Sequence, residues 1–299
     1  MHKSGFVNII GNPNVGKSTL MNRLVGERLS IITSKAQTTR HRIMGIVNGD
    51  DFQIVYSDTP GILKPSYKLQ ESMMKFVHGA VQDADVILYV TDTVELTAEG
   101  EGAENRSTEV VEKIAHSGIP TIVVINKIDL TTPEALETMA ERCKRRLPDA
   151  HIVPVSALEG FNIPGLFDLI LQLLPEGEPF YPKDALTDRS LRFFASEIIR
   201  EKILLNYSKE IPYSVEITID EYKEEPEIDR IGATIHVARE SQKGILIGHK
   251  GERLKKVGTA ARIDLEKFLD KKVFLQLHVK VSDDWRNDTR QLRRFGYEE

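Results

Sequence analysis

Short apolar runs alternate with amphipathic stretches through the first half of the chain. Five of these runs are rich in β-branched residues and bounded by turn residues, which predicts buried strands at residues 6–11, 52–58, 85–92, 121–127 and 151–157. The helical spacing of apolar positions predicts helices between them, at residues 17–26, 107–118 and 137–147. Strands that alternate with helices favour an α/β fold, with a mostly parallel sheet covered by helices on both faces.

The order of elements changes after a stretch rich in proline and acidic residues at positions 174–188. The pattern then predicts a helix at residues 189–207 and alternating strands at 213–225 and 228–240. A glycine loop at 248–251, a helix at 251–269, a strand at 271–283 and a short charged helix at the C-terminus follow. This order is typical of a compact α+β domain. We therefore expect a first domain over residues 1–176, a linker over 177–188 and a second domain over 189–299.

Composition narrows the class of protein without identifying it. The 299 residues contain one cysteine, Cys143, so a disulfide framework is excluded, and we expect an unreactive thiol on a helix. No stretch approaches about 20 continuous apolar residues, and the first residues lack the apolar run of a signal peptide. These features favour a cytoplasmic protein, which we expect to be a monomer.

Charge is unevenly distributed along the chain. The net charge is −5, and the acidic excess lies in the first 182 residues. Within residues 243–256, by contrast, Lys and Arg residues outnumber the single acidic residue, Glu252. Local positive charge of this kind attracts nucleic acid even where the whole chain is acidic.

A phosphate-binding loop follows the first predicted strand and precedes the first predicted helix. It consists of Gly11, Asn12, Pro13, Asn14, Val15, Gly16, Lys17, Ser18 and Thr19. Glycines at this spacing let successive backbone N–H groups point at phosphate oxygens, and the helix N-terminus reinforces them. We expect Lys17 to reach the β- and γ-phosphates and the Ser18 hydroxyl to ligate Mg²⁺.

Three further segments complete a guanine-nucleotide site. Asp58 ends a predicted strand, where it contacts Mg²⁺ through water, and Gly61 offers its N–H to a γ-phosphate. Asp129 can accept hydrogen bonds from both N1–H and the 2-amino group of guanine, a donor pair that adenine lacks. The other predicted guanine contacts are Asn126, Lys127, Ser156, Ala157 and Leu158. We expect Asn126 to brace the loops, Lys127 to lie over the base and the Ala157 N–H to bind O6. The sequence therefore predicts a GTPase.

Two positions bear on how this GTPase would hydrolyse GTP. Ile62 follows Gly61, where Ras-like GTPases carry a glutamine that orients the attacking water. An isoleucine cannot hydrogen-bond to water, so we expect slow intrinsic hydrolysis or another group that places the water. Asn14 occupies the position where potassium-activated GTPases carry an asparagine. It either helps to hold K⁺ beside the phosphates or only satisfies the loop backbone.

Two segments are expected to switch with nucleotide. The first is the polar stretch 34–45, in which Thr39, or else Thr38, would complete the Mg²⁺ shell. Its basic residues Arg40, His41 and Arg42 are interpreted as a solvated or RNA-facing patch rather than as catalytic groups. The second switch begins at Asp58, Thr59, Pro60, Gly61 and Ile62.

A second glycine loop, at residues 248–251, lacks the features of a nucleotide loop. Lys250 lies between its two glycines, and no Ser or Thr follows Gly251. An apolar stretch approaches it, a helix opens directly after it, and a strand follows that helix, which is the order of a KH domain. The predicted RNA-binding residues are Gly248, His249, Lys250, Gly251, Arg253, Lys255 and Lys256, with Ile245 and Ile247 as candidates for a groove wall.

Taken together, the motifs GNPNVGKST, KAQTTRHR, DTPG, NKID, SAL and IGHKGERLKKVGTAAR resemble the bacterial Era family over essentially the whole chain. The resemblance implies a GTPase domain followed by a type II KH domain. It further implies binding to the 3′ end of 16S rRNA, a role in 30S subunit assembly and, in some members, peripheral association with the cell membrane. The acidic stretch 93–107 is longer than expected between a strand and a helix.

Two other classes stay open at this point. The chain would be a signalling or cell-cycle GTPase if its second domain bound a protein or a membrane. However, no strongly amphipathic basic helix with exposed aromatic residues supports a membrane role. GTPases that act in tRNA modification share the phosphate loop but lack a KH domain, and no residues typical of modification chemistry occur here.

Overall fold

The structure is a computed structural model that describes residues 1–97 and 101–297, except for the side chains of residues 97 and 101–107. The chain divides into an N-terminal unit of residues 1–66 and 73–188 and a C-terminal unit of residues 67–72 and 189–299. Within the acidic stretch 93–107, residues 98–100 fall outside the described residues, and the residues on either side of them belong to two helices. In the part of the chain that is described, no helix combines the length and apolar character needed to cross a bilayer.

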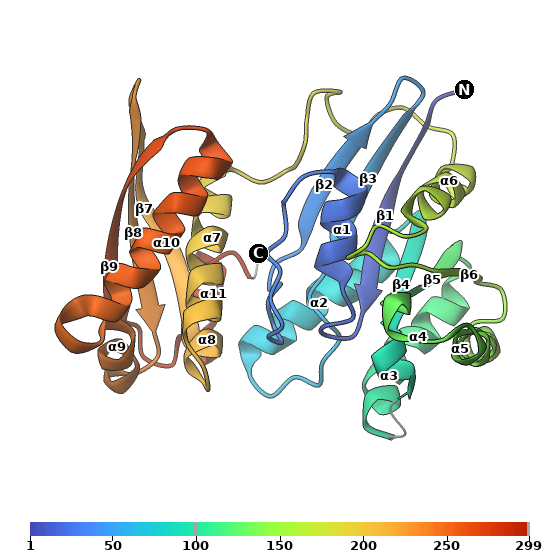
Figure 1. The fold of residues 1–299 in the computed structure, drawn as a ribbon, viewed down its shortest axis with the longest axis horizontal. Helices are drawn as coiled ribbons and strands as arrows, with labels where there is room; N and C mark the ends of the chain where they lie inside the picture. The colour runs from blue at the N-terminus through green and yellow to red at the C-terminus, as the bar shows by residue number, and fades with distance from the viewer. Residues whose placement is uncertain (98–100, 298–299) are drawn as a thin grey trace. The chain divides into compact units, whose positions relative to one another are not determined.

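The N-terminal unit is built on a six-stranded sheet in the order β2-β3-β1-β4-β5-β6. Its strands are β1 (Lys3–Gly11), β2 (Ile43–Asn48), β3 (Phe52–Asp58), β4 (Val86–Asp92), β5 (Thr121–Asn126) and β6 (His151–Pro154). All neighbours pair in parallel except β2, which runs antiparallel to β3 at the edge. The mostly parallel α/β fold is confirmed (Figure 1).

Helices cover this sheet and bury its apolar strands. They are α1 (Lys17–Val25), α2 (Lys68–Gln82), α3 (Thr93–Thr97), α4 (Glu101–Ser117), α5 (Pro133–Arg146) and α6 (Ile163–Leu173). One core cluster joins β1, β4 and β5 to α2, α4 and α5, and it includes Ile10, Val77 and Ile125. Because parallel strands deliver their carboxyl ends to one edge, the loops after β1, β3 and β5 meet there.

Cys143 lies buried on α5 inside the same core cluster. Burial raises the pKa of its thiol to about 11. The predicted inert thiol on a helix is therefore confirmed.

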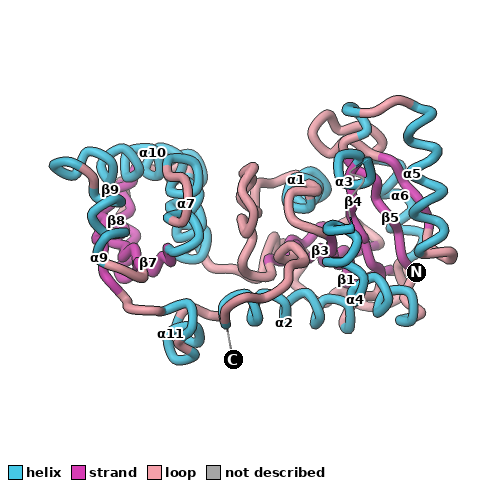
Figure 2. The backbone as a smooth tube through the Cα atoms, turned by 90° about the horizontal axis from the view of Figure 1, so that it is seen from below, coloured by secondary structure: helices cyan, strands magenta, loops and turns pink. Residues whose placement is uncertain are grey.

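The C-terminal unit has a three-stranded sheet in the order β7-β8-β9, with α10 on one side of it and α11 on the other (Figure 2). Its strands are β7 (Val215–Glu224), β8 (Ile228–Val237) and β9 (Lys272–Val281), and its helices are α7 (Leu191–Asn206), α8 (Ile211–Ser214), α9 (Glu240–Ile247), α10 (Glu252–Leu269) and α11 (Thr289–Arg294). β7 pairs antiparallel with β8, whereas β9 pairs parallel with β8 and forms one edge. The core packs Ile199 and Ile203 of α7 and Val257 of α10 against the sheet.

Several elements were not predicted from the sequence, among them the helices α2, α3, α6 and α8. β2 was not predicted as a strand either, and the apolar stretch that leads to the second glycine loop is the helix α9. Within α9, Leu246 is fully buried whereas Ile245 is exposed, which is the periodicity of a helix on a core. The C-terminal unit is therefore an α+β domain in which two helices flank the glycine loop.

Candidate nucleotide site and nucleic-acid groove

The phosphate-binding loop lies between β1 and α1, as the motif requires. Asn14 and Gly16 adopt left-handed backbone angles, with φ of 66° and 95°. A Cβ at Gly16 would stand 2.2 Å from the side-chain nitrogen of Asn126, so only glycine lets the loop approach so closely. The buried Lys17 donates through Nζ to the carbonyls of Gly11 at 3.0 Å and Asn12 at 2.8 Å. The loop thus holds its lysine at the start of a helix, ready to meet an anion.

Electrostatics at Lys17 reflect its burial. Desolvation lowers the pKa of this amine to about 8, while the nearby carboxylates of Asp58 and Glu95 oppose the shift. A phosphate beside Lys17 would favour the protonated amine in the same way. The site is therefore suited to a strongly anionic ligand.

Three oxygen-bearing side chains converge beside the lysine. The Ser18 Oγ donates to Asp58 Oδ2 at 2.7 Å and lies 3.0 Å from Thr39 Oγ1, which itself lies 3.2 Å from Asp58 Oδ2. The other oxygen of Asp58 is buried and receives no hydrogen bond from the described residues. Burial raises the pKa of this carboxyl. A buried carboxylate with an unused oxygen, next to two hydroxyls, is the donor set that fits Mg²⁺.

The loops after β5 and β6 are tied to the phosphate-binding loop. Asn126 donates to the Val15 carbonyl at 2.9 Å and accepts from the Ala157 N–H at 3.0 Å. Lys127 donates to the Asn14 carbonyl at 2.7 Å. The Ala157 N–H that the sequence assigns to guanine O6 is thus engaged by Asn126, so an O6 contact would share it.

The remaining predicted guanine contacts surround this brace. Asp129 is exposed in a 3₁₀ turn, Ile128–Leu130, that directly follows Lys127. Ser156 is buried and accepts from the Glu159 N–H at 3.2 Å, whereas Leu158 is 68% exposed. Asp129 therefore has a free approach to a base held beside Lys127.

A cleft of about 260 Å³ lies over the phosphate-binding loop, bordered by Gly61 on one side and by residues 31–39 on the other. Lys35 and Gln37 line it, although the sequence singled out neither. Ile62 does not line it and is instead buried in the core at 1% exposure. Its backbone N–H donates to the Gly11 carbonyl at 3.1 Å. Ile62 therefore has no means of contacting a water in the cleft.

The switch residues take different positions around this cleft. The Thr38 Oγ1 donates to the Lys35 carbonyl at 2.6 Å, which leaves Thr39 as the threonine beside Asp58. Thr59 is buried and donates to the Ile9 carbonyl at 2.7 Å, and Pro60 is buried beside it. Of the two threonines that the sequence left open, only Thr39 contacts the Asp58 carboxylate.

The basic patch predicted at Arg40, His41 and Arg42 is not a solvated surface. Arg40 is 0% exposed and His41 is 7% exposed. Arg42 donates to Ser57 Oγ at 2.6 Å and forms an ion pair with Asp83 at 2.5 Å. The prediction of a solvated surface was wrong, because His41 packs against Phe76 of α2 and Arg42 bonds to Ser57 of β3 instead of projecting outward.

The second glycine loop joins α9 to α10. Gly248, Lys250 and Gly251 have φ of 71°, 49° and 80°, so three residues with positive φ bring the chain to the start of α10. His249 and Lys250 are exposed at the tip, and Arg253, Lys255 and Lys256 are exposed on the first turns of the helix. Backbone N–H groups at the N-terminus of α10 therefore lie among positive charges, an arrangement suited to phosphate.

A groove of about 360 Å³ continues from this loop between α10 and β9. One wall is the face of α10 that carries Leu254, Lys255, Gly258 and Arg262, and the other carries Leu275 and Leu277 of β9. Since β9 is an edge strand, one row of its backbone N–H and C=O groups is not paired within the sheet. Sequence reasoning missed Gly258 and Arg262, although their helical spacing from Gly251 indicates one face of α10.

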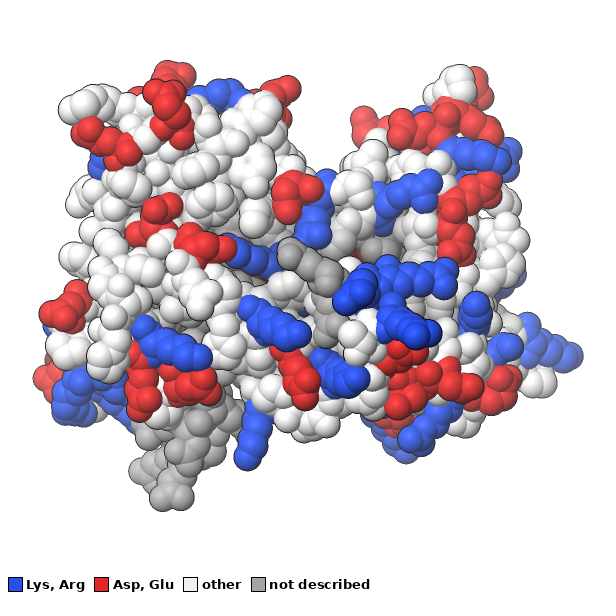
Figure 3. Space-filling model, turned by 180° about the vertical axis from the view of Figure 1, so that it is seen from behind, with Lys and Arg blue, Asp and Glu red and all other residues white. Residues whose placement is uncertain are grey.

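A second cavity, of about 480 Å³, lies on the other side of the loop. It is lined by Tyr207, Lys209, Ile245, Arg253 and Lys256, among others. The face of this unit away from α10 mixes acidic and basic side chains (Figure 3). Positive charge is thus concentrated where the glycine loop meets its two hollows, which favours a polyanion there.

The comparisons with known proteins agree with both units. A family model described as a 50S ribosome-binding GTPase matches residues 6–127, and a KH-domain model matches residues 210–286. The fold and the two sites define a P-loop GTPase joined to a KH domain. The chain is 46% identical over 301 residues to the GTPase Era of Syntrophus aciditrophicus, covering 100% of this chain and 96% of that protein. The chain belongs to the Era family of GTPases, which hydrolyse GTP.

Other relatives extend this match to solved structures. The GTPase Era of Staphylococcus haemolyticus is 44% identical and aligns with 99% of this chain and 97% of its own length. A crystal structure of a substituted Aquifex aeolicus Era bound to GDP·AlF4⁻ superposes with a TM-score of 0.93 at 42% identity, covering 99% of this chain and 100% of that one. An Era complex with MgGDPNP and nucleotides 1506–1542 of 16S ribosomal RNA gives the same TM-score and identity, with 100% of each chain covered.

Proposed function

We propose that this GTPase is a nucleotide-controlled switch that binds the 3′ end of 16S rRNA through its KH unit and acts in assembly of the small ribosomal subunit. The groove between α10 and β9, opened by a glycine loop with clustered positive charge, is the observation that carries this proposal. The relative solved with 16S rRNA nucleotides supports the identity of the RNA. No feature of the described residues favours a membrane or a signalling partner over RNA.

At the nucleotide site, GTP would lie in the cleft over Gly16 and Lys17, with its base near Asp129. Ser18 and Thr39 would hold Mg²⁺, with Asp58 behind them, and the ion would neutralise charge on the β- and γ-phosphates. Lys17 would leave the carbonyls of Gly11 and Asn12 to bind phosphate oxygens. Gly61 would donate its backbone N–H to the γ-phosphate, and this hydrogen bond would be lost when GTP is hydrolysed.

The residue after Gly61 cannot orient water in this site, because it is Ile62 and its side chain is buried in the core. We infer that Asn14, which is exposed at the tip of the phosphate-binding loop, helps to hold K⁺ beside the phosphates. A cation there would stabilise charge that develops during hydrolysis. GTP turnover should therefore be faster in KCl than in NaCl at matched ionic strength, and equal rates would refute the role of Asn14.

RNA binding and nucleotide binding would be coupled through the switch segments. If GTP favours the RNA-binding state, linkage requires RNA to tighten GTP binding by the same factor. Both halves of this statement can be measured on the full chain. The proposed coupling is refuted if both factors equal one; since linkage requires the two factors to be equal, each measurement checks the other.

The decisive experiment measures the affinity for an RNA oligonucleotide that spans nucleotides 1506–1542 of 16S rRNA. We expect this RNA to bind at least tenfold more tightly than a scrambled oligonucleotide of equal length, and more tightly with a non-hydrolysable GTP analogue than with GDP. Equal affinity for the two RNAs would overturn the assignment to the 3′ end. Crosslinking in cells, followed by sequencing of the bound RNA, would then identify the actual partner.

A further inference from the structure

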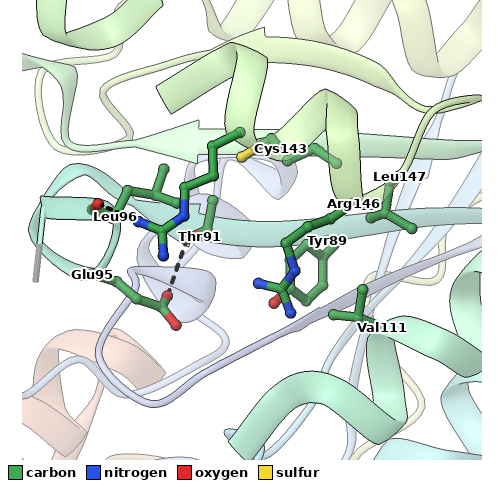
Figure 4. Close-up of a pocket in the computed structure, with 10 residues that line it drawn as sticks. Tyr89, Thr91, Glu95, Leu96, Val111, Cys143, Arg146 and Leu147 are labelled. Atoms are coloured by element: carbon green, nitrogen blue, oxygen red, sulfur yellow. Dashed lines mark hydrogen bonds between the residues drawn. The ribbon is translucent and has the colours of Figure 1, made fainter. Parts of the chain in front are cut away.

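The short helix α3 contacts both of the loops that would hold GTP. It begins directly after β4, and the Glu95 backbone N–H donates to Asp92 Oδ1 at 2.7 Å. The Glu95 side chain accepts a hydrogen bond from Asn12 Nδ2 in the phosphate-binding loop and another from Thr91 Oγ1 at 3.1 Å. Figure 4 shows Glu95 with its carboxylate directed to Thr91, at the border of a small pocket between β4 and α5.

The start of α3 also holds the loop that would bind guanine. Asp92 forms an ion pair with Lys127, whose Nζ donates to the Asn14 carbonyl at 2.7 Å. The Thr93 Oγ1 donates to the Lys127 carbonyl at 3.0 Å. Residues 92–95 are therefore bonded on one side to Lys127 and on the other to Asn12.

Asn12 transmits this contact to the phosphate-binding lysine. Its side chain is 7% exposed, and its carbonyl accepts from Lys17 Nζ at 2.8 Å. The side-chain oxygen of Asn12 receives no hydrogen bond from the described residues, so the bond from its Nδ2 to Glu95 is what fixes the side chain. If that bond is lost, the buried amide is left unsatisfied and the loop relaxes at the residue that holds Lys17.

We propose that Glu95 is a positioning residue, which sets the phosphate-binding loop for GTP through its hydrogen bond from Asn12. The Glu95 carboxylate also opposes the lowering of the Lys17 pKa, so the test has to separate positioning of Asn12 from the effect of charge on Lys17. Glu95 does not touch the cleft residues that would face the nucleotide, and its effect passes through Asn12. This inference rests on the proposed binding of GTP at Lys17.

The test uses four variants of the full chain: Glu95→Ala, Glu95→Gln, Asn12→Ala and the double variant with alanine at both positions. Steady-state GTP hydrolysis gives KM and kcat, and release of a fluorescent GDP analogue gives a dissociation rate. We expect Glu95→Ala and Asn12→Ala each to raise KM about tenfold and to speed GDP release by a similar factor, with kcat within about threefold. The double variant should be no worse than either single variant.

Glu95→Gln separates positioning from charge, because its side-chain oxygen still accepts from Asn12 while its charge is gone. Recovery to within about threefold of the unchanged chain supports positioning through the hydrogen bond. A KM as high as that of Glu95→Ala overturns it. Unchanged kinetics in Glu95→Ala, or additive effects in the double variant, also overturn it.

Two controls separate this inference from other failures. Glu137→Ala removes an exposed carboxylate from α5 and should leave KM and thermal stability unchanged. Lys17→Ala should abolish GTP binding, and if it does not, the proposed phosphate site is wrong whatever Glu95 does. Thermal unfolding of each variant checks folding. Should Glu95→Ala fail to fold, Asn12→Ala and Glu95→Gln carry the same test.

Discussion

Replacing Gly258 with alanine should weaken RNA binding without weakening the fold. Gly258 lies inside α10 on the wall of the groove, and an added Cβ would stand 3.3 Å from Leu277 Cδ1 across it. Glycine inside a helix costs about 1 kcal/mol relative to alanine. The Leu277 side chain has to shift slightly to make room for the added Cβ, and this shift offsets part of the stability gained from alanine. The variant should therefore be as stable as the unchanged chain or more stable, by up to about 1 kcal/mol.

The effect on RNA follows from what the new methyl group occupies. A base in this groove would pack against the α10 wall at Gly258, and a methyl group there would hold the base away from the helix. A loss of about 1.4 kcal/mol corresponds to a tenfold weaker affinity. Fluorescence anisotropy with the 16S rRNA oligonucleotide measures this loss, and GTP hydrolysis without RNA should stay unchanged.

The matched control is Gly79→Ala in α2, where an added Cβ meets nothing within 4 Å. It makes the same chemical change inside a helix and should raise stability without altering RNA affinity. If Gly258→Ala binds RNA within twofold of the unchanged chain while remaining folded, bases do not approach α10 at this position. The groove between α10 and β9 would then not be the RNA site.

Three further predictions concern the C-terminal unit. Lys250→Glu should weaken RNA binding at least tenfold and flatten its dependence on salt, with GTP affinity unchanged, as titrations at several KCl concentrations would measure. Burial lowers the pKa of His236 to about 4, below its unfolded value, so stability should be full above pH 6.5 and fall by up to about 3 kcal/mol as the pH drops towards 4. In the His236→Gln variant, the free energy of unfolding measured with urea should lose most of this dependence on pH. If the variant keeps the same slope of stability against pH, His236 is not the cause of the dependence. Trp285→Ala should cost this unit about 3–5 kcal/mol in urea unfolding, because Trp285 is 0% exposed and its Nε1 donates to the Ser214 carbonyl at 3.0 Å; a loss below 1 kcal/mol would contradict this.

The predicted acid sensitivity of His236 depends on its whole surroundings. Its ring nitrogens lie 3.0 Å from Thr218 Oγ1 and 2.9 Å from Ser282 Oγ, and its ring packs against Phe295 in a tilted arrangement. Nearby Arg294 and Lys280 disfavour a second positive charge, and Asp220 opposes them only partly. The unfolded chain therefore takes up the proton first as the pH falls, which draws the equilibrium towards unfolding.

The strands of the central sheet were predictable because they are short, apolar and fully covered. β3, for example, has the predicted bounds, Phe52–Asp58. β2 escaped prediction because it lies at the edge and carries Gly45, which breaks the apolar pattern. A Cβ there would stand 2.7 Å from Met21 and Val25 side chains, so the glycine is required by packing that the local sequence does not reveal.

Part of the nucleotide site was likewise readable in the sequence, because its motifs place backbone groups and charged residues within a few positions of one another. Arg42 was misjudged because its partner, Asp83, lies 41 positions away and meets it only through the fold. Glu95 was missed for the same reason, since its bond partner Asn12 is 83 positions distant. Local patterns predict which residues meet phosphate, whereas long-range contacts decide how those residues are held.

The two glycine loops show why similar backbone leads to different chemistry. Each uses left-handed residues to bring a chain to a helix N-terminus, at Gly16 before α1 and at Gly251 before α10. Lys17 is 6% exposed, beside a buried carboxylate and a hydroxyl, so a phosphate there would be enclosed away from water, where charge stabilisation is strong. Lys250 is exposed and the helix after it begins with Glu252, so a phosphate there stays in solvent, where attraction is screened. The first loop therefore suits catalysis on one enclosed nucleotide, and the second suits reversible contact with successive phosphates of a nucleic-acid strand.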